Sequence, residues 1–356
     1  MDMQSGVRIG RVLGFIFSTL GLTWGIHWFT AQHLGGEAFL NQPPLGMLIP
    51  GFVALVIEVF ISKESRLHFR KFKEHPRLIF YAFMLMTITA GVITALGWFT
   101  QVPIYLLSAL SEMLFVSWTL FVIYLYRRCG EESFRLAGLQ LGDKEKGIPF
   151  VIGIMLFFPI QAGLNMVFGL GEFQGLQGYI NGIPIPKVIY PFALVGFFIL
   201  AVVGTPLSGL AATFGEEYGW RGFLQRELRP MGLRPSTFVI GVIWATWHIP
   251  IISSGVHTYP PTPTGYLLAY AFFVLWGFVQ SYAVLKTGSV WTAAFLHGVV
   301  NSVYSFTLTY LVRPDDKLFS FGLGAYGLVC MAGVALMILR DPIWSTPHVP
   351  ETTERL

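Results

Sequence analysis

The stretch from Val188 to Arg221 reads VIYPFALVGFFILAVVGTPLSGLAATFGEEYGWR, and it decides the fold class. Its first part, through Phe214, carries no charge and is longer than the roughly 20 apolar residues that cross a bilayer as a helix. It ends at two adjacent carboxylates, Glu216 and Glu217. Four residues apart on a helix, Glu217 and Arg221 can pair on one face, whereas Glu216 points about 100° away and stays available. Ionisable groups at membrane depth usually pair with one another or take part in chemistry. At a cytoplasmic helix end, the same residues would be ordinary solvated charges.

The composition of the whole chain also indicates a membrane protein. The sequence is 54% hydrophobic, 16% aromatic and 12% charged, with a mean hydropathy of +0.63, which excludes an ordinary soluble domain. We attribute the net charge of +4 to Lys and Arg in cytoplasmic loops, so no nucleic-acid partner is predicted. Cys129 and Cys330 fall in a predicted loop and a predicted span, so no disulfide framework is expected.

Apolar runs long enough to span a bilayer predict an all-α, polytopic membrane bundle of about ten helices. The predicted spans are 11–31, 45–62, 78–100, 103–126, 148–169, 188–214, 236–253, 265–285, 290–312 and 318–339. The shorter runs, 45–62 and 236–253, give the weakest signal.

The loops between these spans alternate in their content of Lys and Arg. Basic residues precede the first span and occupy every second connection, namely Arg8, Arg11, Lys63, Arg66, Arg70, Lys71, Lys73, Arg77, Arg127, Arg128, Arg135, Lys144, Lys146, Arg221, Arg226, Arg229, Arg234, Lys286 and Arg340. Under the positive-inside rule, both termini face the cytoplasm of a multi-pass protein, expected in the cell membrane. Lys187, Arg313 and Lys317, on the predicted outer side, depart from the pattern.

The polar segment 127–147 divides the chain. It predicts an N-terminal membrane region (1–147) of unknown role, a catalytic membrane domain (148–340, motif core 188–312) and a cytoplasmic tail (341–356). In the first four spans, His27, Glu58 and Glu112 have no obvious partner. The loop histidines His68, His75 and His257 are expected to be solvated.

Two further polar clusters lie in later spans. Trp244 and His248 are four residues apart in one span, as are His297 and Asn301 in another, so each pair shares a helix face. Taken singly, such residues are usually hydrogen-bonding groups between helices or interfacial aromatics. Together with the glutamates they are costly to keep in lipid.

Two kinds of chemistry suit this set of side chains. A carboxylate and an imidazole can activate one water, while a second imidazole and an amide donate to the tetrahedral oxygen. Alternatively, Glu216, His248 and His297 match a zinc ligand set with an open water position. No His-Glu-x-x-His motif favours zinc. The sequence therefore requires no cofactor and leaves zinc open.

The three motifs resemble those of the CPBP intramembrane proteases, which include type II CAAX prenyl endopeptidases and bacteriocin-processing or self-immunity proteins. The resemblance rests on Glu-Glu-x-x-x-Arg, aromatic-x-x-x-His and His-x-x-x-Asn, in that order, within residues 188–312. It implies that Glu216 and His248 activate water, and that His297 and Asn301 stabilise the oxyanion. Glu217 and Arg221 would orient and hold the first motif. Trp244 stands where the family usually has Phe, which we expect to alter pocket shape rather than chemistry.

These roles require the motif residues to meet at one depth in the membrane. At 1.5 Å per residue, His297 lies roughly 10 Å and His248 roughly 18 Å from the cytoplasmic ends of their spans. We therefore expect Gly215–Leu228 to continue as a partly buried helix beside a cavity that opens to the cytoplasm.

The predicted function is hydrolysis of a peptide bond in a membrane-associated substrate, such as a CAAX-type, leader or precursor peptide. The expected partners are membrane lipids and this peptide or lipidated protein. The alternatives are a non-catalytic immunity or scaffold protein and a transporter. A transporter would have discontinuous helices and paired repeats, and no such repeat is visible in the sequence.

Overall fold

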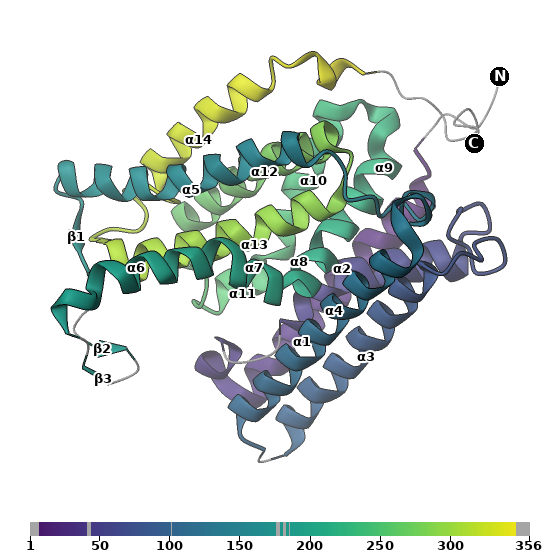
Figure 1. The fold of residues 1–356 in the computed structure, drawn as a ribbon, viewed down its shortest axis with the longest axis horizontal. Helices are drawn as coiled ribbons and strands as arrows, with labels where there is room; N and C mark the ends of the chain where they lie inside the picture. The colour runs from purple at the N-terminus through teal and green to yellow at the C-terminus, as the bar shows by residue number, and fades with distance from the viewer. Residues whose placement is uncertain are drawn as a thin grey trace.

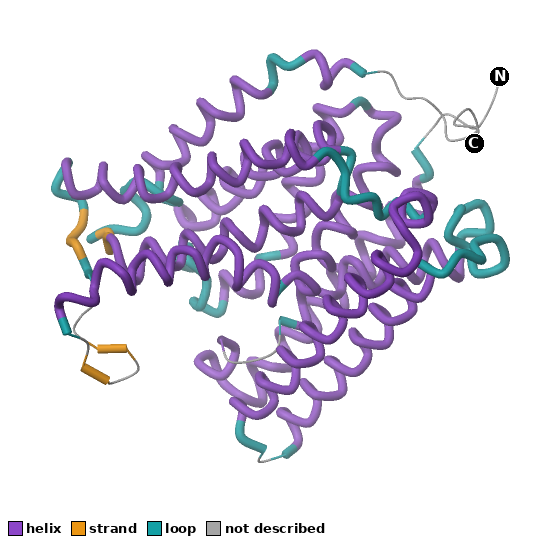
Figure 2. Tube along the Cα trace, viewed as in Figure 1, coloured by secondary structure: helices purple, strands orange, loops and turns teal. Residues whose placement is uncertain are grey.

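The computed structural model describes residues 7–40, 44–100, 102–175, 179–180, 183–184 and 186–346. Most of these residues are helical (Figures 1 and 2). The α-helices are α1 (Ile9–Leu40), α2 (Leu45–Val56), α3 (Arg77–Phe99), α4 (Ile104–Leu136), α5 (Lys144–Val167), α6 (Tyr190–Ile199), α7 (Thr205–Ser208), α8 (Leu210–Glu217), α9 (Gln225–Leu228), α10 (Leu233–Trp247), α11 (Ile249–Ser253), α12 (Pro263–Thr287), α13 (Val290–Phe306) and α14 (Ala325–Ile338). Four π-helical stretches extend or join them: Ile57–Ile61, Leu200–Gly204, Tyr218–Leu224 and Thr307–Leu311.

Two short antiparallel pairs of strands are the sheet structure of the described residues. Strand β1 (Gly171–Phe173) pairs with β4 (Val312–Pro314), and β2 (Tyr179–Ile180) pairs with β3 (Ile183–Pro184). An all-α prediction does not anticipate them, but they lie in connections and leave the helical class unchanged.

Each predicted span overlaps helix in the structure, although the predicted span 318–339 is helical only over Ala325–Ile338. Six helical segments of the described chain are long and apolar enough to cross a membrane: Ile9–His33, Arg77–Phe99, Tyr105–Leu136, Lys144–Val167, Lys187–Ser208 and Pro263–Thr287. Leu45–Ile61 and Ala325–Ile338 are shorter apolar helices. The helical, multi-pass character is thus established, whereas the count of ten and the cytoplasmic termini remain predictions. The end of the predicted tail, 347–356, lies outside the described residues.

The segment that carries the Glu-Glu motif is a helix with interruptions. The predicted span 188–214 breaks at Gly209, after Pro206, where the backbone leaves the helical region (φ −85°, ψ 4°). Helical structure then resumes as α8, passes through the π-helical stretch Tyr218–Leu224 and ends in α9. Nearly all of 211–228 is buried, so the expected continuation of the Glu216 segment is present, and it is more deeply buried than expected.

Glycines allow α8 to lie directly against α2. A Cβ on Gly215 would lie 2.6 Å from the Met47 carbonyl oxygen and 2.8 Å from Leu48 Cα, and a Cβ on Gly51 would lie 2.7 Å from the Gly215 oxygen. Close backbone approach of this kind is how small residues pack membrane helices. The N-terminal region therefore directly supports the helix that carries Glu216.

A tight turn fixes α13 against α12. Gly288 ends α12 in the left-handed region (φ 72°), which glycine adopts without a steric penalty. Ser289 then caps α13, because its hydroxyl accepts from the Trp291 N–H at 3.2 Å. The two helices run antiparallel, and this brings Gln280 beside the first turn of α13, where it donates to the Ala293 oxygen at 3.2 Å.

The loops rich in Lys and Arg meet at one end of the bundle, here called the basic end. Contacts that join its segments are Arg8–Glu64, Arg11–Glu227, Arg226–Glu58, Arg234–Leu339, Lys286–Asp341 and Gln140–Gly288. The far end holds the α3–α4 connection, the β1–β4 pair and the segments 254–262 and 318–324. Tyr259 joins the last two by donating to the Leu323 oxygen at 2.8 Å.

Two expectations for the N-terminal region are wrong. Glu58 does have partners, because it accepts from the Tyr218 hydroxyl at 2.7 Å and pairs with Arg226. His68, expected in solvent, is buried at 5% exposure. Glu58 therefore ties the end of α2 to the segment that carries the first motif.

Candidate active site

Glu216 has one carboxylate oxygen held and lines a cavity. The indole N–H of Trp244, on α10, donates to Glu216 Oε2 at 2.8 Å, and the residue is 2% exposed. A hydrogen bond to an ionised acceptor is among the stronger kinds. Phe has no such donor, so Trp244 adds a hydrogen bond to Glu216 besides its effect on pocket shape, and its effect on the chemistry stays a prediction.

Glu217 faces away from this cavity and contacts three partners on three helical segments. Its carboxylate pairs with Arg221, with Nη1 at 3.0 Å from Oε2, and both side chains are fully buried. Gln280 of α12 donates to Oε1 at 3.4 Å, and His297 Nδ1 lies 2.8 Å from the same oxygen. Glu217 thus orients the third motif as well as pairing with Arg221 inside the first.

Arg221 also holds the second motif. Its guanidinium carbon lies 4.3 Å from the centroid of the Trp244 ring, a favourable cation–π position. Arg221 and Glu217 together therefore contact side chains of all three motifs from beneath the cavity.

Hydrogen bonds fix both motif histidines by one ring nitrogen. His248 Nδ1 lies 2.9 Å from the Trp244 carbonyl oxygen. A carbonyl oxygen only accepts hydrogen bonds, so Nδ1 carries a proton, and Nε2 is the ring nitrogen that this bond does not occupy. His297 is held in the same way, with Nδ1–H donating to the Glu217 carboxylate. The His248 ring also stacks on Phe273 with centroids 3.9 Å apart.

Local sequence explains where His248 sits. Helix α10 ends at Trp247, and Pro250 stands in the first turn of α11, where it cannot donate to the preceding turn. His248 therefore occupies the junction between two helices (φ −81°, ψ −6°) rather than a helix interior.

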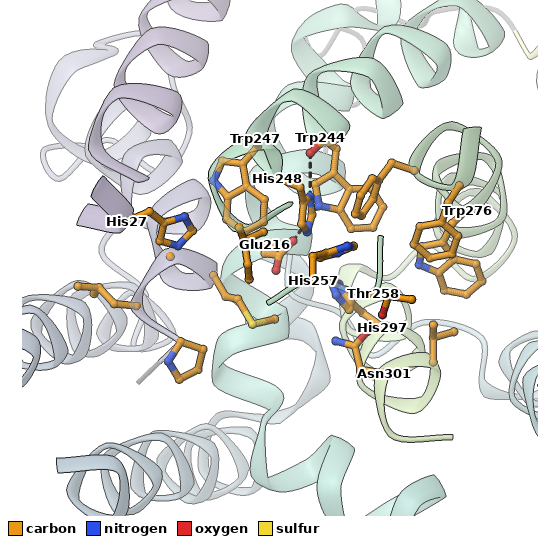
Figure 3. Close-up of a pocket in the computed structure, with 18 of the residues that line it drawn as sticks. His27, Glu216, Trp244, Trp247, His248, His257, Thr258, Trp276, His297 and Asn301 are labelled. Atoms are coloured by element: carbon orange, nitrogen blue, oxygen red, sulfur yellow. Dashed lines mark hydrogen bonds between the residues drawn. The ribbon is translucent and has the colours of Figure 1, made fainter. Parts of the chain in front are cut away.

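One cavity of about 410 Å³ brings the predicted catalytic residues together (Figure 3). Glu216, Trp244, His248, His297 and Asn301 all line it. Glu217 and Arg221, predicted to support them, are not lining residues and lie beneath its floor.

Sequence reasoning missed part of the cavity wall. His27 of α1 and His257 of the far-end loop both line it, whereas the sequence predicts an isolated His27 and a solvated His257. The His257 ring centroid lies 5.6 Å from that of His248 and 5.6 Å from that of Tyr259. No local spacing connects these residues to the motifs, so only the fold reveals them. Ile26, His27, Thr30 and residues 44–47 line the cavity, so the N-terminal region forms one of its walls.

The expectation that the cavity opens to the cytoplasm stays a prediction. At the basic-end side its floor is closed by Glu217, Arg221 and Gln280, which are buried. Exposure rises in the other direction along α13, from the buried His297 to the exposed Asn301 and Ser305.

Zinc at this site stays a prediction. Among the residues that the structure describes, no group of three or more His, Cys, Asp or Glu side chains is placed to hold one ion. Glu216, His248 and His297 all line the cavity, but they are not grouped closely enough to hold one ion as they stand.

Fold and site together define a multi-pass helical membrane protein with a buried carboxylate and two oriented imidazoles in one cavity. Residues 191–303 match the family model described as type II CAAX prenyl endopeptidase Rce1-like. The match confirms the resemblance to the CPBP family over these residues. It runs from α6 into α13, so α1–α5 and α14 lie outside it. No curated protein matches the chain.

Proposed function

We propose that the chain hydrolyses a peptide bond of a membrane-associated substrate, such as a CAAX-type, leader or precursor peptide, with a water activated by Glu216 and His248. The observation that supports this best is the shared cavity of Glu216, His248, His297 and Asn301. The protein would act in the cell membrane.

The first step is attack by water. Glu216 takes a proton from the water as its oxygen bonds to the scissile carbonyl carbon, and the His248 imidazole orients the same water. Trp244 keeps Oε2 of Glu216 occupied, so the other carboxylate oxygen is left for the proton.

The tetrahedral oxyanion then needs donors. The Asn301 amide can supply one, and His297 can supply another from Nε2 when its ring is doubly protonated, a form that the Glu217 carboxylate stabilises. As the C–N bond breaks, the proton on Glu216 passes to the leaving amine, giving one carboxylate product and one amine product.

The test is cleavage in reconstituted liposomes, followed by mass spectrometry of a lipidated C-terminal peptide and of a leader peptide. Glu216→Gln and His248→Ala should each lower turnover at least about 100-fold, because a positioned acid–base group typically contributes that much. The control is Glu112→Gln, an exposed carboxylate of α4, which should retain wild-type turnover.

Two outcomes would contradict the proposal. Peptide binding without turnover in the wild type would favour the immunity or scaffold alternative. Full activity of Glu216→Gln would remove the proposed base. A chelator added to the wild type tests the metal, and we expect turnover to persist.

A further inference from the structure

We propose that His257, a residue outside the three motifs, binds the peptide substrate by donating a hydrogen bond from its Nε2 to a backbone carbonyl oxygen of the peptide. This inference rests on the proposed function for the peptide nature of the ligand. The place of the His257 ring in the cavity and its hydrogen bond to the loop do not depend on that function.

The first observation is that a hydrogen bond decides which ring nitrogen of His257 carries the proton. The backbone N–H of Tyr259 donates to His257 Nδ1 at 3.2 Å. A backbone N–H can only donate, so Nδ1 is the acceptor and the proton of the neutral ring is on Nε2. Among the residues that the structure describes, none is hydrogen-bonded to this Nε2. His257 therefore has an N–H donor that no described residue uses.

The second observation is that the His257 ring is held in place by its own loop. It stacks on the Tyr259 ring, with centroids 5.6 Å apart and planes inclined by 23°. Tyr259 is itself fixed, because it is 1% exposed and its hydroxyl donates to the Leu323 oxygen at 2.8 Å. The Nε2 donor is thus ordered before a ligand arrives, so a ligand that accepts from it immobilises little further side-chain freedom.

The third observation is that His257 lines the same cavity as the motif residues (Figure 3). Its ring lies edge-to-face with that of His248, with centroids 5.6 Å apart. His248 Nδ1 donates to the Trp244 oxygen, so Nε2 of the neutral His248 ring is an acceptor. Two neighbouring rings therefore offer an acceptor, which suits a proton of the attacking water, and a donor, which suits a carbonyl oxygen of the peptide.

The cavity lining favours a carbonyl oxygen over an anionic group as the partner of His257. The described lining includes no Lys or Arg, and it already contains the Glu216 carboxylate. An anion would lie in this cavity without a counter-charge, whereas a neutral amide carbonyl needs only an uncharged donor. Phe272, Trp276 and Val300 belong to the same lining, and apolar surroundings of this kind strengthen a hydrogen bond.

Two substitutions separate the donor at Nε2 from the turn that Nδ1 makes. Asparagine has an oxygen near the position of Nδ1, so His257→Asn keeps an acceptor for the Tyr259 N–H and loses the donor. Glutamine reaches further and places its amide N–H near the position of Nε2, so His257→Gln keeps a donor and loses the turn acceptor. His75→Asn, at an exposed position of the α2–α3 loop, is the control for the substitution itself.

Binding is measured in the full chain carrying Glu216→Gln, so that the peptide is not cleaved during the measurement. The probe is the lipidated C-terminal peptide of the cleavage assay, labelled with a fluorophore and prepared both as the free acid and as the C-terminal amide. Fluorescence anisotropy at one detergent concentration gives Kd for each variant, and thermal unfolding gives Tm.

We expect His257→Asn to raise Kd about tenfold for both forms of the peptide, because a carbonyl oxygen of the bound peptide then lacks its donor. Its Tm should equal that of the Glu216→Gln parent, since the turn is kept. His257→Gln and His75→Asn should bind both forms nearly as tightly as the parent.

Several results would overturn the proposal. Tight binding by His257→Asn with weak binding by His257→Gln would show that the turn matters and the donor does not, and equal Kd values for the two variants would also exclude the donor. A loss confined to the free acid would assign His257 to the terminal carboxylate instead of a backbone carbonyl. A parent that does not bind the peptide would remove the ligand altogether. A wild-type chain that binds the peptide without cleaving it would count against the proposed hydrolysis alone.

Discussion

At the scale of single residues, the indole of Trp244 has contacts on two sides. Its N–H donates to Glu216, while the guanidinium of Arg221 lies against its ring face. An indole held in this way fixes the position of one carboxylate oxygen of Glu216, and we assign Trp244 a positioning role.

Trp244→Phe keeps an aromatic ring and removes the donor to Glu216. Leaving a buried acceptor without its partner costs about 1–3 kcal/mol, so we expect kcat to fall about tenfold to a hundredfold while KM stays unchanged. Steady-state kinetics in liposomes would show the split between the two constants.

Trp247→Phe is the matched control, because this indole of the same helix donates to Thr23 at 2.9 Å and not to Glu216. It should change kcat little. A Trp244→Phe enzyme with wild-type kcat would rule out the positioning role.

The residues that the sequence revealed share a local pattern. Glu217 and Arg221, Trp244 and His248, and His297 and Asn301 are each four apart, so helical geometry alone predicts that each pair shares a face. His27, His257 and Gln280 have no such pairing with the motifs, and they reach the site through packing of α1, the far-end loop and α12. Tertiary contacts of this kind are not encoded in spacing.

The contact between α2 and α8 is the main feature at the scale of elements. Gly215 precedes Glu216, and any side chain there would meet the backbone of Met47 and Leu48. The depth of the catalytic carboxylate is therefore set by how closely two helices approach.

Gly215→Ala should push these helices apart. Overpacking of a tight contact typically costs about 1–3 kcal/mol, so we expect a lower Tm in detergent together with reduced turnover. The control is Gly153→Ala on α5, where a Cβ meets open space and the helix should be unchanged or slightly more stable. Equal Tm values for the two variants would contradict the tight α2–α8 contact.

The apolar runs located the helices but not their interruptions. The break at Gly209 and the junction at His248 both place motif residues at the depth of the cavity, and both follow from proline and glycine in apolar sequence. Pro and Gly are tolerated inside membrane helices because neighbours satisfy the freed backbone groups. Whether a helix breaks or continues at such a residue therefore depends on neighbours that the sequence does not identify.

At the scale of the whole molecule, ion pairs join the segments of the basic end. One of them, Asp341, joins the end of α14 to α12: it accepts from the Tyr282 hydroxyl at 2.7 Å and from Lys286 at 2.9 Å. The Ile343 backbone N–H, followed by these two donors, lowers the pKa of Asp341 to about 2.

A carboxyl whose pKa is depressed by folding stabilises the protein above its unfolded pKa of about 3.9 and loses that contribution as pH falls through the folded value. Asp341→Asn should therefore lower Tm at pH 7, and its difference from wild type should shrink between about pH 4 and pH 2. Thermal scans across this range provide the measurement. Asp315→Asn, an exposed carboxylate at the far end, is the control. A Tm difference independent of pH would show that the carboxylate charge is not involved.

The partners of Glu217 have a consequence for biogenesis. Its carboxylate is synthesised long before Gln280 and His297, so a ribosome-bound chain that ends before α12 carries this anion in lipid with Arg221 as its main counter-charge. Nascent chains halted there should be retained by insertion factors or degraded, whereas chains released after α13 should survive. Survival of the nascent chain would thus depend on whether Glu217 has met its partners on α12 and α13.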